Sequence, residues 1–254
     1  MVNGGVVCAH RLRTLRFVLF LLLLAAAPRA IAECVDPATL IHSTVSVTKH
    51  FSEEEREKDP TLLGIRGTAW FLSVRLLVTA AHVAQSMHLS NCDWTQVEIS
   101  GAEGKLSNSV RIQNVAGSGA EKIAVLELRS ALPASGRLQI RTEPLTAGER
   151  LVSLAYPGNR LRFAVGRFAT YGDGGKYAGL ALLEMYDGED RLVLDHGASG
   201  APVLDCEGRV VAVVSNIFAQ TLPFMSQAIR VSTAWGSPNV ASVPITVLEL
   251  RPED

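Results

Sequence analysis

Cysteine is scarce in this chain, with four among 254 residues. Cys8 lies close to the N-terminus, which leaves Cys34, Cys92 and Cys206 for the rest of the chain. Three cysteines form at most one internal disulfide and leave one thiol over, so a framework of several disulfides is excluded. The sequence does not choose the pair, and three buried, reduced cysteines are also compatible with it.

Motifs typical of metal and nucleic-acid chemistry are missing as well. The sequence holds neither His-Glu-x-x-His nor Cys-x-x-Cys, so a metal mechanism has no support and we expect no metal site. The chain has 24 basic and 25 acidic residues. Because nucleic-acid binding requires a basic patch, nothing in this balance indicates a nucleic-acid partner.

The N-terminal segment has the three parts of a secretory signal peptide. Three arginines between positions 11 and 16 precede the apolar run Phe17–Ala27, and Ala30-Ile31-Ala32 supplies small residues at both cleavage-site positions. The apolar run is well short of the roughly 20 residues that span a bilayer, which disfavours the alternative of an uncleaved anchor. We therefore expect residues 1–32 to be removed and the protein to be exported, periplasmic or secreted, without stable membrane insertion. Loss of the leader's four arginines leaves 20 basic and 25 acidic residues, a net charge of −5.

The rest of the chain is punctuated like a β-protein. Short apolar, β-branched runs alternate with Gly, Asn, Asp and Pro, at a spacing of about 8–12 residues that is typical of a barrel or a sandwich. Gly67–Leu72 and Leu76–Thr79, for example, indicate a hairpin. A short helix is expected at Ala80–Gln85, and another near Ile245.

Two further segments bear on the organisation of the domain. Ser130–Gly136 is the natural linker between two halves, which predicts an N-terminal half over residues 33–135 and a C-terminal half over 136–254. The strongly charged stretch Glu53–Pro60 is expected to be a solvated surface loop.

The most distinctive stretch surrounds Ser199, in Asp195-His196-Gly197-Ala198-Ser199-Gly200-Ala201-Pro202-Val203. A serine between glycines fits a tight turn that exposes its hydroxyl. In such a turn the amides of Gly197 and Ser199 can point at one spot, as an oxyanion hole requires. Alone the pattern is weak, because a serine flanked by glycine is common in ordinary turns.

A second stretch, Leu77-Val78-Thr79-Ala80-Ala81-His82-Val83, brings an apolar strand to a histidine through small residues. His82 precedes Ser199 by 117 residues, and each lies at the end of a β-run in its own half. A general base and a nucleophile so arranged would face each other across a cleft. The α/β-hydrolases are excluded because their histidine follows the serine, whereas the last histidine here is His196.

These two stretches resemble the signatures of trypsin-like serine proteases, and further blocks resemble the bacterial high-temperature-requirement (Deg-type) branch. Those blocks are Gly67–Phe71, Gly148–Val152, Ala155–Pro157, Asp205–Val211 and Val243–Ile245. The resemblance covers roughly residues 40–250 and leaves no room for a PDZ domain. It implies an all-β fold of two six-stranded barrels of the chymotrypsin type with a short C-terminal helix. It also implies a serine endopeptidase that acts on polypeptides without a cofactor, with Ser199 as nucleophile, His82 as base and the amides of Gly197 and Ser199 as oxyanion hole.

The sequence departs from the family pattern at the catalytic acid. The family places an aspartate just before a strand like Ile123-Ala124-Val125-Leu126, and here Lys122 occupies that position with Glu121 one residue earlier. Glu121 supplying the carboxylate through a one-residue bulge, Asp93 reaching in, and a Ser-His pair with weak or absent turnover all remain open. Losing the acid of such a triad costs on the order of 10⁴ in kcat. Ala201, where the family usually has glycine, would matter only if that position needed a positive φ.

Specificity follows from the resemblance alone. Val193 would lie near the base of the primary pocket, with Val214, Ser215 and Asn216 along its wall. The absence of an acid at that base favours small or apolar substrate side chains. A catalytically inactive peptide-binding protein on the same fold is the alternative to a protease, and an esterase-like hydrolase uses the same acyl chemistry. The sequence does not determine the oligomeric state.

Overall fold

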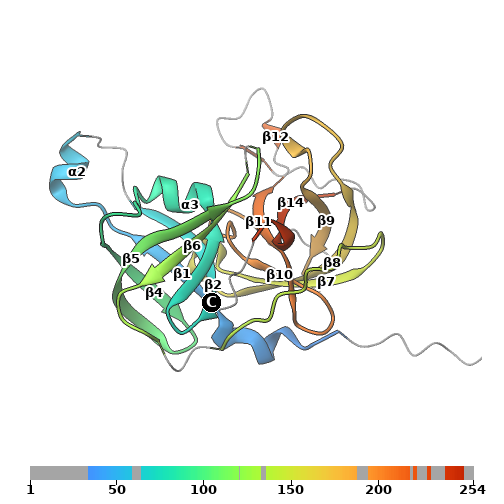
Figure 1. Cartoon of the computed structure of the whole chain (residues 1–254), viewed down its shortest axis with the longest axis horizontal. Coiled ribbons are helices and arrows are strands. Elements are labelled where there is room, and N and C mark those ends of the chain that lie inside the picture. The colour runs from blue at the N-terminus through green and yellow to red at the C-terminus, as the bar shows by residue number, and fades with distance from the viewer. Residues whose placement is uncertain are drawn as a thin grey trace, which may run out of the picture. The chain divides into compact units, whose positions relative to one another are not determined.

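Two closed barrels, each of six antiparallel strands, make up most of the described chain (Figure 1). The computed structural model describes residues 34–58, 64–119, 121–132, 136–187, 194–217, 220–221, 228–229 and 238–248. The predicted all-β class with two six-stranded barrels is confirmed. Among these residues no helix is both long enough and apolar enough to cross a membrane.

The first barrel carries the segment that leads to His82. Its strands, in spatial order, are β1 (Thr44–Lys49), β2 (Ile65–Ser73), β3 (Leu76–Ala80), β6 (Ile123–Leu128), β5 (Gly104–Ala116) and β4 (Thr95–Gly101). A 3-10 turn, Pro37–Ser43, precedes β1. The short helix α3 (Ala81–Ser86) follows β3 directly and packs on the barrel through buried Val83 and Ala84.

The second barrel carries the Ser199 turn. Its strands, in spatial order, are β10 (Pro202–Leu204), β11 (Val210–Ile217), β14 (Val240–Pro244), β9 (Ala181–Tyr186), β8 (Arg162–Tyr171) and β7 (Arg150–Ala155). Short 3-10 turns lie at Pro157–Asn159, Gly175–Tyr177 and Ile245–Val247, and the pair β12 (Gln220–Thr221) and β13 (Ala228–Ile229) forms a separate hairpin. The last turn stands where the C-terminal helix was predicted, and residues beyond 248 lie outside the described ranges.

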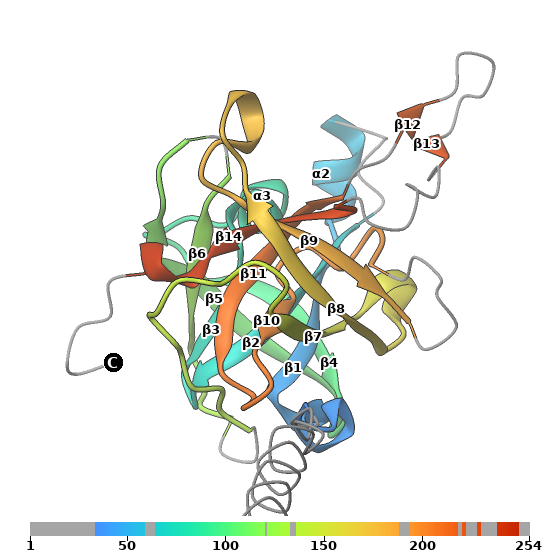
Figure 2. The same cartoon turned by 90° about the vertical axis from the view of Figure 1, so that its right-hand side faces the viewer.

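An apolar cluster joins the two barrels. It lies where β11 of the second barrel passes beside β3 of the first (Figure 2). Fully buried Trp70 and Val78 of the first barrel share this cluster with Leu154, Val213 and Val243 of the second. Burial of this area from water holds β3 and β11 against each other. β3 leads directly into the helix that carries His82, and β11 holds the Ser199 turn, where Gly200 N–H donates to the Val214 carbonyl at 2.7 Å, so the interface sets the site.

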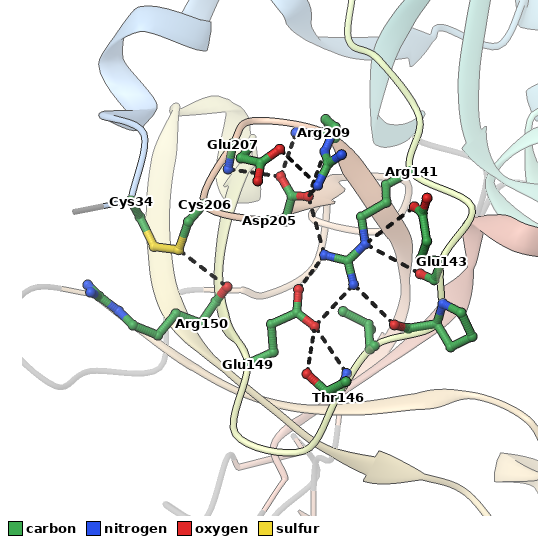
Figure 3. Close-up of polar contacts among 12 residues, drawn as sticks. Cys34, Arg141, Glu143, Thr146, Glu149, Arg150, Asp205, Cys206, Glu207 and Arg209 are labelled. Atoms are coloured by element: carbon green, nitrogen blue, oxygen red, sulfur yellow. Dashed lines mark hydrogen bonds and ion pairs between the residues drawn. A yellow bond between two sulfur atoms is a disulfide. The ribbon is translucent and has the colours of Figure 1, made fainter. Parts of the chain in front are cut away.

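The segment between the barrels is held by a buried guanidinium (Figure 3). Arg141 donates to both carboxylate oxygens of Glu149, at 3.1 Å for Oε2, and to Oδ2 of Asp205 at 3.3 Å. Hydrogen bonds from Arg141 hold the pKa of Glu149 below its usual range. Burial alone would raise the pKa of Asp205, but hydrogen bonds from Arg209 and Arg141 outweigh it and lower the pKa. The network therefore ties the connecting segment to the β10–β11 hairpin.

A disulfide joins Cys34 to Cys206, across 172 residues of sequence. The Val35 amide also donates to the Cys206 carbonyl at 3.0 Å, so the start of the described chain is fastened to the β10–β11 hairpin (Figure 3). Cys92 is a free, exposed thiol. The alternative of three buried, reduced cysteines is therefore wrong.

The charged stretch expected to be a loop forms a helix, α2 (Glu53–Lys58). Ser52 begins it with a capping box, in which the Glu55 amide donates to Ser52 Oγ and the Ser52 amide donates to Glu55 Oε2. A hydrogen bond from Lys49, followed by that of the Ser52 amide, lowers the pKa of Glu55 to about 2. Acidic residues in the first turn and basic ones in the last complement the helix dipole.

Candidate active site

Ser199 lies in a tight turn that leads into β10. Gly197 and Gly200 on either side have φ angles of +98° and +91°, a region that residues with a Cβ rarely adopt. A Cβ on Gly200 would also stand 2.0 Å from the Thr68 carbonyl oxygen, so the turn presses directly on β2. Ala201 is not among the residues with positive φ, so its difference from glycine leaves the turn intact.

His82 lies in the first turn of α3, immediately after β3. Gly67 of β2 makes room for this helix, because a Cβ there would approach Val83 Cγ1 to 2.5 Å. The small residues before His82 are buried, with Ala80 fully enclosed and Ala81 5% exposed. The predicted helix at this position is present, shifted by one residue.

Glu121 is the acid that meets His82. The register of β3 and β6 runs without a break from Leu76–Glu127 to Ala80–Ile123, and Ala81 N–H donates to the Lys122 carbonyl at 2.8 Å. His82 directly follows Ala81, and Glu121 directly precedes Lys122, so this hydrogen bond brings these two residues close to each other. Glu121 Oε2 lies 3.6 Å from His82 Nδ1, and the contact needs no bulge in this ladder.

The other two acid-position candidates lie elsewhere. Lys122 binds Ala81, directly after β3, through its carbonyl, and it is not among the described residues that line a cavity with His82. Asp93 lies in an exposed turn after Leu89, where its carboxylate accepts a hydrogen bond from Ser90 Oγ at 3.3 Å. Of the three, Glu121 alone is brought to the histidine.

Ser215, on β11, connects the acid with the serine. Its hydroxyl donates to Glu121 Oε2, and its carbonyl accepts the hydrogen bond of Ser199 Oγ at 3.3 Å. Within the described ranges Ser199 Oγ makes this one hydrogen bond, so the hydroxyl donates to Ser215 and not to His82. Ser215 was expected only in the wall of the primary pocket.

One cavity of about 290 Å³ brings these groups together. It is lined by His82, Glu121, Asp195, His196, Ser199, Val214, Ser215 and Asn216. Three of the four residues predicted to form the primary pocket are therefore in its wall, and the fourth, Val193, lies outside the described residues. In the described ranges no three His, Cys, Asp or Glu residues come together as a metal site would require.

The direction of two backbone amides of the Ser199 turn, those of Gly197 and Ser199, follows from the carbonyls that precede them. The His196 carbonyl accepts from Gly158 N–H at 3.4 Å, and the Ala198 carbonyl accepts from Ala201 N–H at 2.9 Å. In a trans peptide the N–H points opposite to the C=O, so the Gly197 and Ser199 amides turn away from these partners. Neither amide donates a hydrogen bond to any group in the part of the chain that the structure describes.

Comparison with known proteins places this geometry in a family. Residues 67–213, more than half of the chain, match the model of the trypsin-like peptidase domain. The chain belongs to this family. A comparison of the trypsin-like domain with curated proteins found no match.

Solved structures similar to this trypsin-like peptidase domain share its fold at low sequence identity. An inactive form of Rv3671c from Mycobacterium tuberculosis H37Rv is 16% identical with a TM-score of 0.52, over 86% of this chain and 89% of that one. The crystal structure of Deg5 is also 16% identical, with a TM-score of 0.53 over 82% of this chain and 86% of that one. An active form of Rv3671c protease is 18% identical, with a TM-score of 0.50 over 84% and 83% of the two chains.

Two parts of this trypsin-like site are not predicted from the sequence. Thr68 contacts the Ser199 turn from β2, and the Pro157–Asn159 turn delivers the Gly158 amide to the His196 carbonyl. A hydroxyl within an otherwise apolar strand, directly after Gly67, is the signal that marks Thr68. Nothing local marks Gly158, because its partner is 38 residues further along the chain.

Proposed function

We propose that this protein is an exported serine endopeptidase that hydrolyses peptide bonds through an acyl-enzyme on Ser199. The observation that carries the proposal is the shared cavity, in which His82, Glu121 and Ser199 meet from three separate segments of the chain. Membership of the trypsin-like peptidase family supports the same reaction class. Nucleophile, base and acid are the three parts that such acyl transfer requires.

The contacts assign a step to each group. Because His82 Nδ1 faces Glu121, its Nε2 is the atom left to take the proton of Ser199 Oγ as the hydroxyl attacks the scissile carbonyl. Glu121 holds the imidazole in that tautomer and stabilises the imidazolium. The Gly197 and Ser199 amides bind the oxygen of the tetrahedral intermediate. His82 then protonates the leaving amine, and water hydrolyses the acyl-enzyme by the same route in reverse.

Export is the part of the proposal that rests on the N-terminal segment. The arginines, apolar run and small residues of positions 1–32 support a cleaved signal peptide, and the Cys34–Cys206 disulfide supports an oxidising destination. The domain boundary near residue 136 and the preference for small or apolar side chains remain proposals of the same kind. Asp195 adds an acid to the cavity wall, close to the turn.

A fluorophosphonate probe tests the nucleophile directly. The protein without residues 1–32 should be labelled, and Ser199→Ala and His82→Ala should not be, while both variants keep the circular dichroism spectrum of the parent. Hydrolysis of casein, compared with hydrolysis of a simple acyl ester, separates an endopeptidase from an esterase. A folded parent protein that stays unlabelled contradicts the proposed reaction.

A second candidate function is peptide binding with weak or absent turnover. The observation that favours it is the Ser199 hydroxyl, which donates to the Ser215 carbonyl instead of to His82. Catalytic hydrogen bonds are often loose before substrate binds, so this geometry alone does not remove the serine from the reaction. Saturable binding of a casein peptide without labelling by the probe would select this second function.

A further inference from the structure

Every polar atom of Thr68 is hydrogen-bonded, and two of them, the amide nitrogen and the hydroxyl oxygen, bind the Ser199 turn. Its amide donates to the Ser199 carbonyl at 2.9 Å, and its hydroxyl donates to the Gly197 carbonyl at 2.6 Å. The same hydroxyl accepts from the Tyr156 amide at 3.0 Å, and the Thr68 carbonyl accepts from Thr79 Oγ1 at 2.7 Å. Thr68 is fully buried, so none of these bonds competes with water.

Both carbonyls that Thr68 holds belong to Gly197 and Ser199, the two residues whose amides are proposed to bind the oxyanion. Thr68 thus holds the peptide groups that follow these residues, while Gly158 and Ala201 hold the peptide groups that carry their N–H groups. The backbone from Gly197 to Ser199 is therefore hydrogen-bonded to Thr68 at both ends. Gly200 packs closely against β2 and β3, because a side chain at this position would collide with the Thr68 carbonyl and Thr79 Oγ1.

We propose that Thr68 is the positioning residue of the oxyanion hole, a role that rests on the proposed function of the site. Its hydroxyl and amide hold the carbonyl ends of Gly197 and Ser199, and so fix where these two residues stand against β2. Thr79 extends the effect to the histidine, since it lies on β3 only three residues before His82 and holds the Thr68 carbonyl. One residue of the first barrel thus fixes the oxyanion donors of the second barrel relative to the base.

The hydroxyl is the part that can be removed cleanly. Valine has the shape of threonine and keeps the backbone amide, but it leaves the Gly197 carbonyl and the Tyr156 amide without their buried partner. We expect the Ser199 turn to shift, because the Gly197 carbonyl and the Tyr156 amide then lack a hydrogen-bond partner. Serine keeps the hydroxyl, so Thr68→Ser should restore whatever Thr68→Val loses.

Saturation kinetics of fluorophosphonate labelling provide the test. For Thr68→Val we expect the maximal labelling rate to fall about 10- to 100-fold, less than the loss of a whole oxyanion donor, with little change in half-saturation. Thr68→Ser should stay close to the parent protein. Ser153→Ala is the matched control, because it also removes a buried hydroxyl that donates to a carbonyl, that of Pro202 at 2.8 Å, without touching Gly197 or Ser199.

Hydrogen exchange of the peptide that spans residues 195–201 gives a second readout that does not require activity. It should exchange faster in Thr68→Val than in the parent or in Ser153→Ala. Equal labelling and equal exchange in parent and Thr68→Val overturn the inference, as does a Ser153→Ala variant that loses as much. If the parent is not labelled at all, the proposed function has failed, and unchanged exchange in Thr68→Val would then overturn the positioning role separately.

Discussion

Glu121 Oε2 lies 3.6 Å from His82 Nδ1, although the residue next to the strand at this point is a lysine. The β3–β6 pairing brings the two together, because it runs to Ala80 opposite Ile123 and is extended by the hydrogen bond from Ala81 N–H to the Lys122 carbonyl, after which His82 and Glu121 are the next residues on each side. A carboxylate therefore meets the imidazole from a position one residue earlier than the family pattern. A glutamate is longer than an aspartate by one methylene, which gives it additional reach.

Glu121→Gln should lower kcat for casein hydrolysis by about 10² to 10⁴, because the amide neither stabilises the imidazolium nor selects its tautomer. Glu127→Gln is the control on the same strand, since Glu127 pairs with Arg111 away from the site. Asp93→Asn should be silent as well. If Glu121→Gln retains full activity while Asp93→Asn loses it, the assignment of the acid is wrong.

Ser215→Ala should lower kcat/KM by about tenfold, because a hydrogen bond to a charged group contributes roughly 1.5 kcal/mol or more. The variant removes the hydroxyl that donates to Glu121 and keeps the carbonyl that accepts from Ser199. Ser100→Ala provides the comparison, since Ser100 Oγ donates to Glu98 on the first barrel at 3.2 Å. Equal kinetics for both variants would show that the Ser215 hydroxyl has no part in holding the acid.

Gly200→Ala should be far more damaging than Gly104→Ala, although both glycines have strongly positive φ. A methyl on Gly200 meets the Thr68 carbonyl oxygen at 2.0 Å, whereas a methyl on Gly104 meets nothing within 4 Å. We expect a loss of unfolding free energy of about 1 kcal/mol at Gly104, from the backbone alone, and of more than about 3 kcal/mol at Gly200. Urea unfolding measures both, and similar losses would mean that the turn can move away from β2.

Cys206→Ser should lower the free energy of unfolding by about 2–5 kcal/mol, because the disulfide closes a long loop of the unfolded chain. Cys92→Ser should leave it nearly unchanged, since Cys92 is exposed and free. The difference between the two variants should vanish when both are measured under reducing conditions. A Cys206→Ser variant as stable as the oxidised parent would contradict this account.

The sequence predicted those parts of the molecule that local pattern determines. β2 and β3, for instance, follow from two apolar runs around Ser73-Val74-Arg75, and the turn between Gly197 and Gly200 follows from glycine spacing. The acid was left open because the choice between Glu121 and Asp93 depends on the register between β3 and β6, which no single segment contains. For the same reason the pairing of Cys34 with Cys206 and the contact of Thr68 with Gly197 appear only in the folded chain. Helix α2 is a different case, because the capping box of Ser52 and Glu55 was present in the sequence and was read as a solvated charge run.

The network around Arg141 predicts how stability depends on pH. The pKa values of Glu149 and Asp205 are lowered in the folded protein, so their ionised forms stabilise the fold. This contribution is complete above the unfolded pKa values of about 4 and is lost as pH falls below them through the folded values. The parent protein should therefore lose unfolding free energy steeply between about pH 5 and pH 2.

Arg141→Gln removes the cationic partner of Glu149 and one of the two arginines that hold Asp205, and it leaves both carboxylates largely buried. We expect a loss of about 3 kcal/mol of unfolding free energy at pH 7, because one side of a buried ion network remains uncompensated. The loss should shrink as pH falls, since protonation removes the charge that lacks a partner, and the two stability curves should converge in acid. Arg111→Gln, which breaks the more exposed pair with Glu127, should instead give a curve nearly parallel to that of the parent. Urea unfolding at a series of pH values measures all three curves, and an Arg141→Gln curve parallel to the parent would mean that the network does not cause the acid sensitivity.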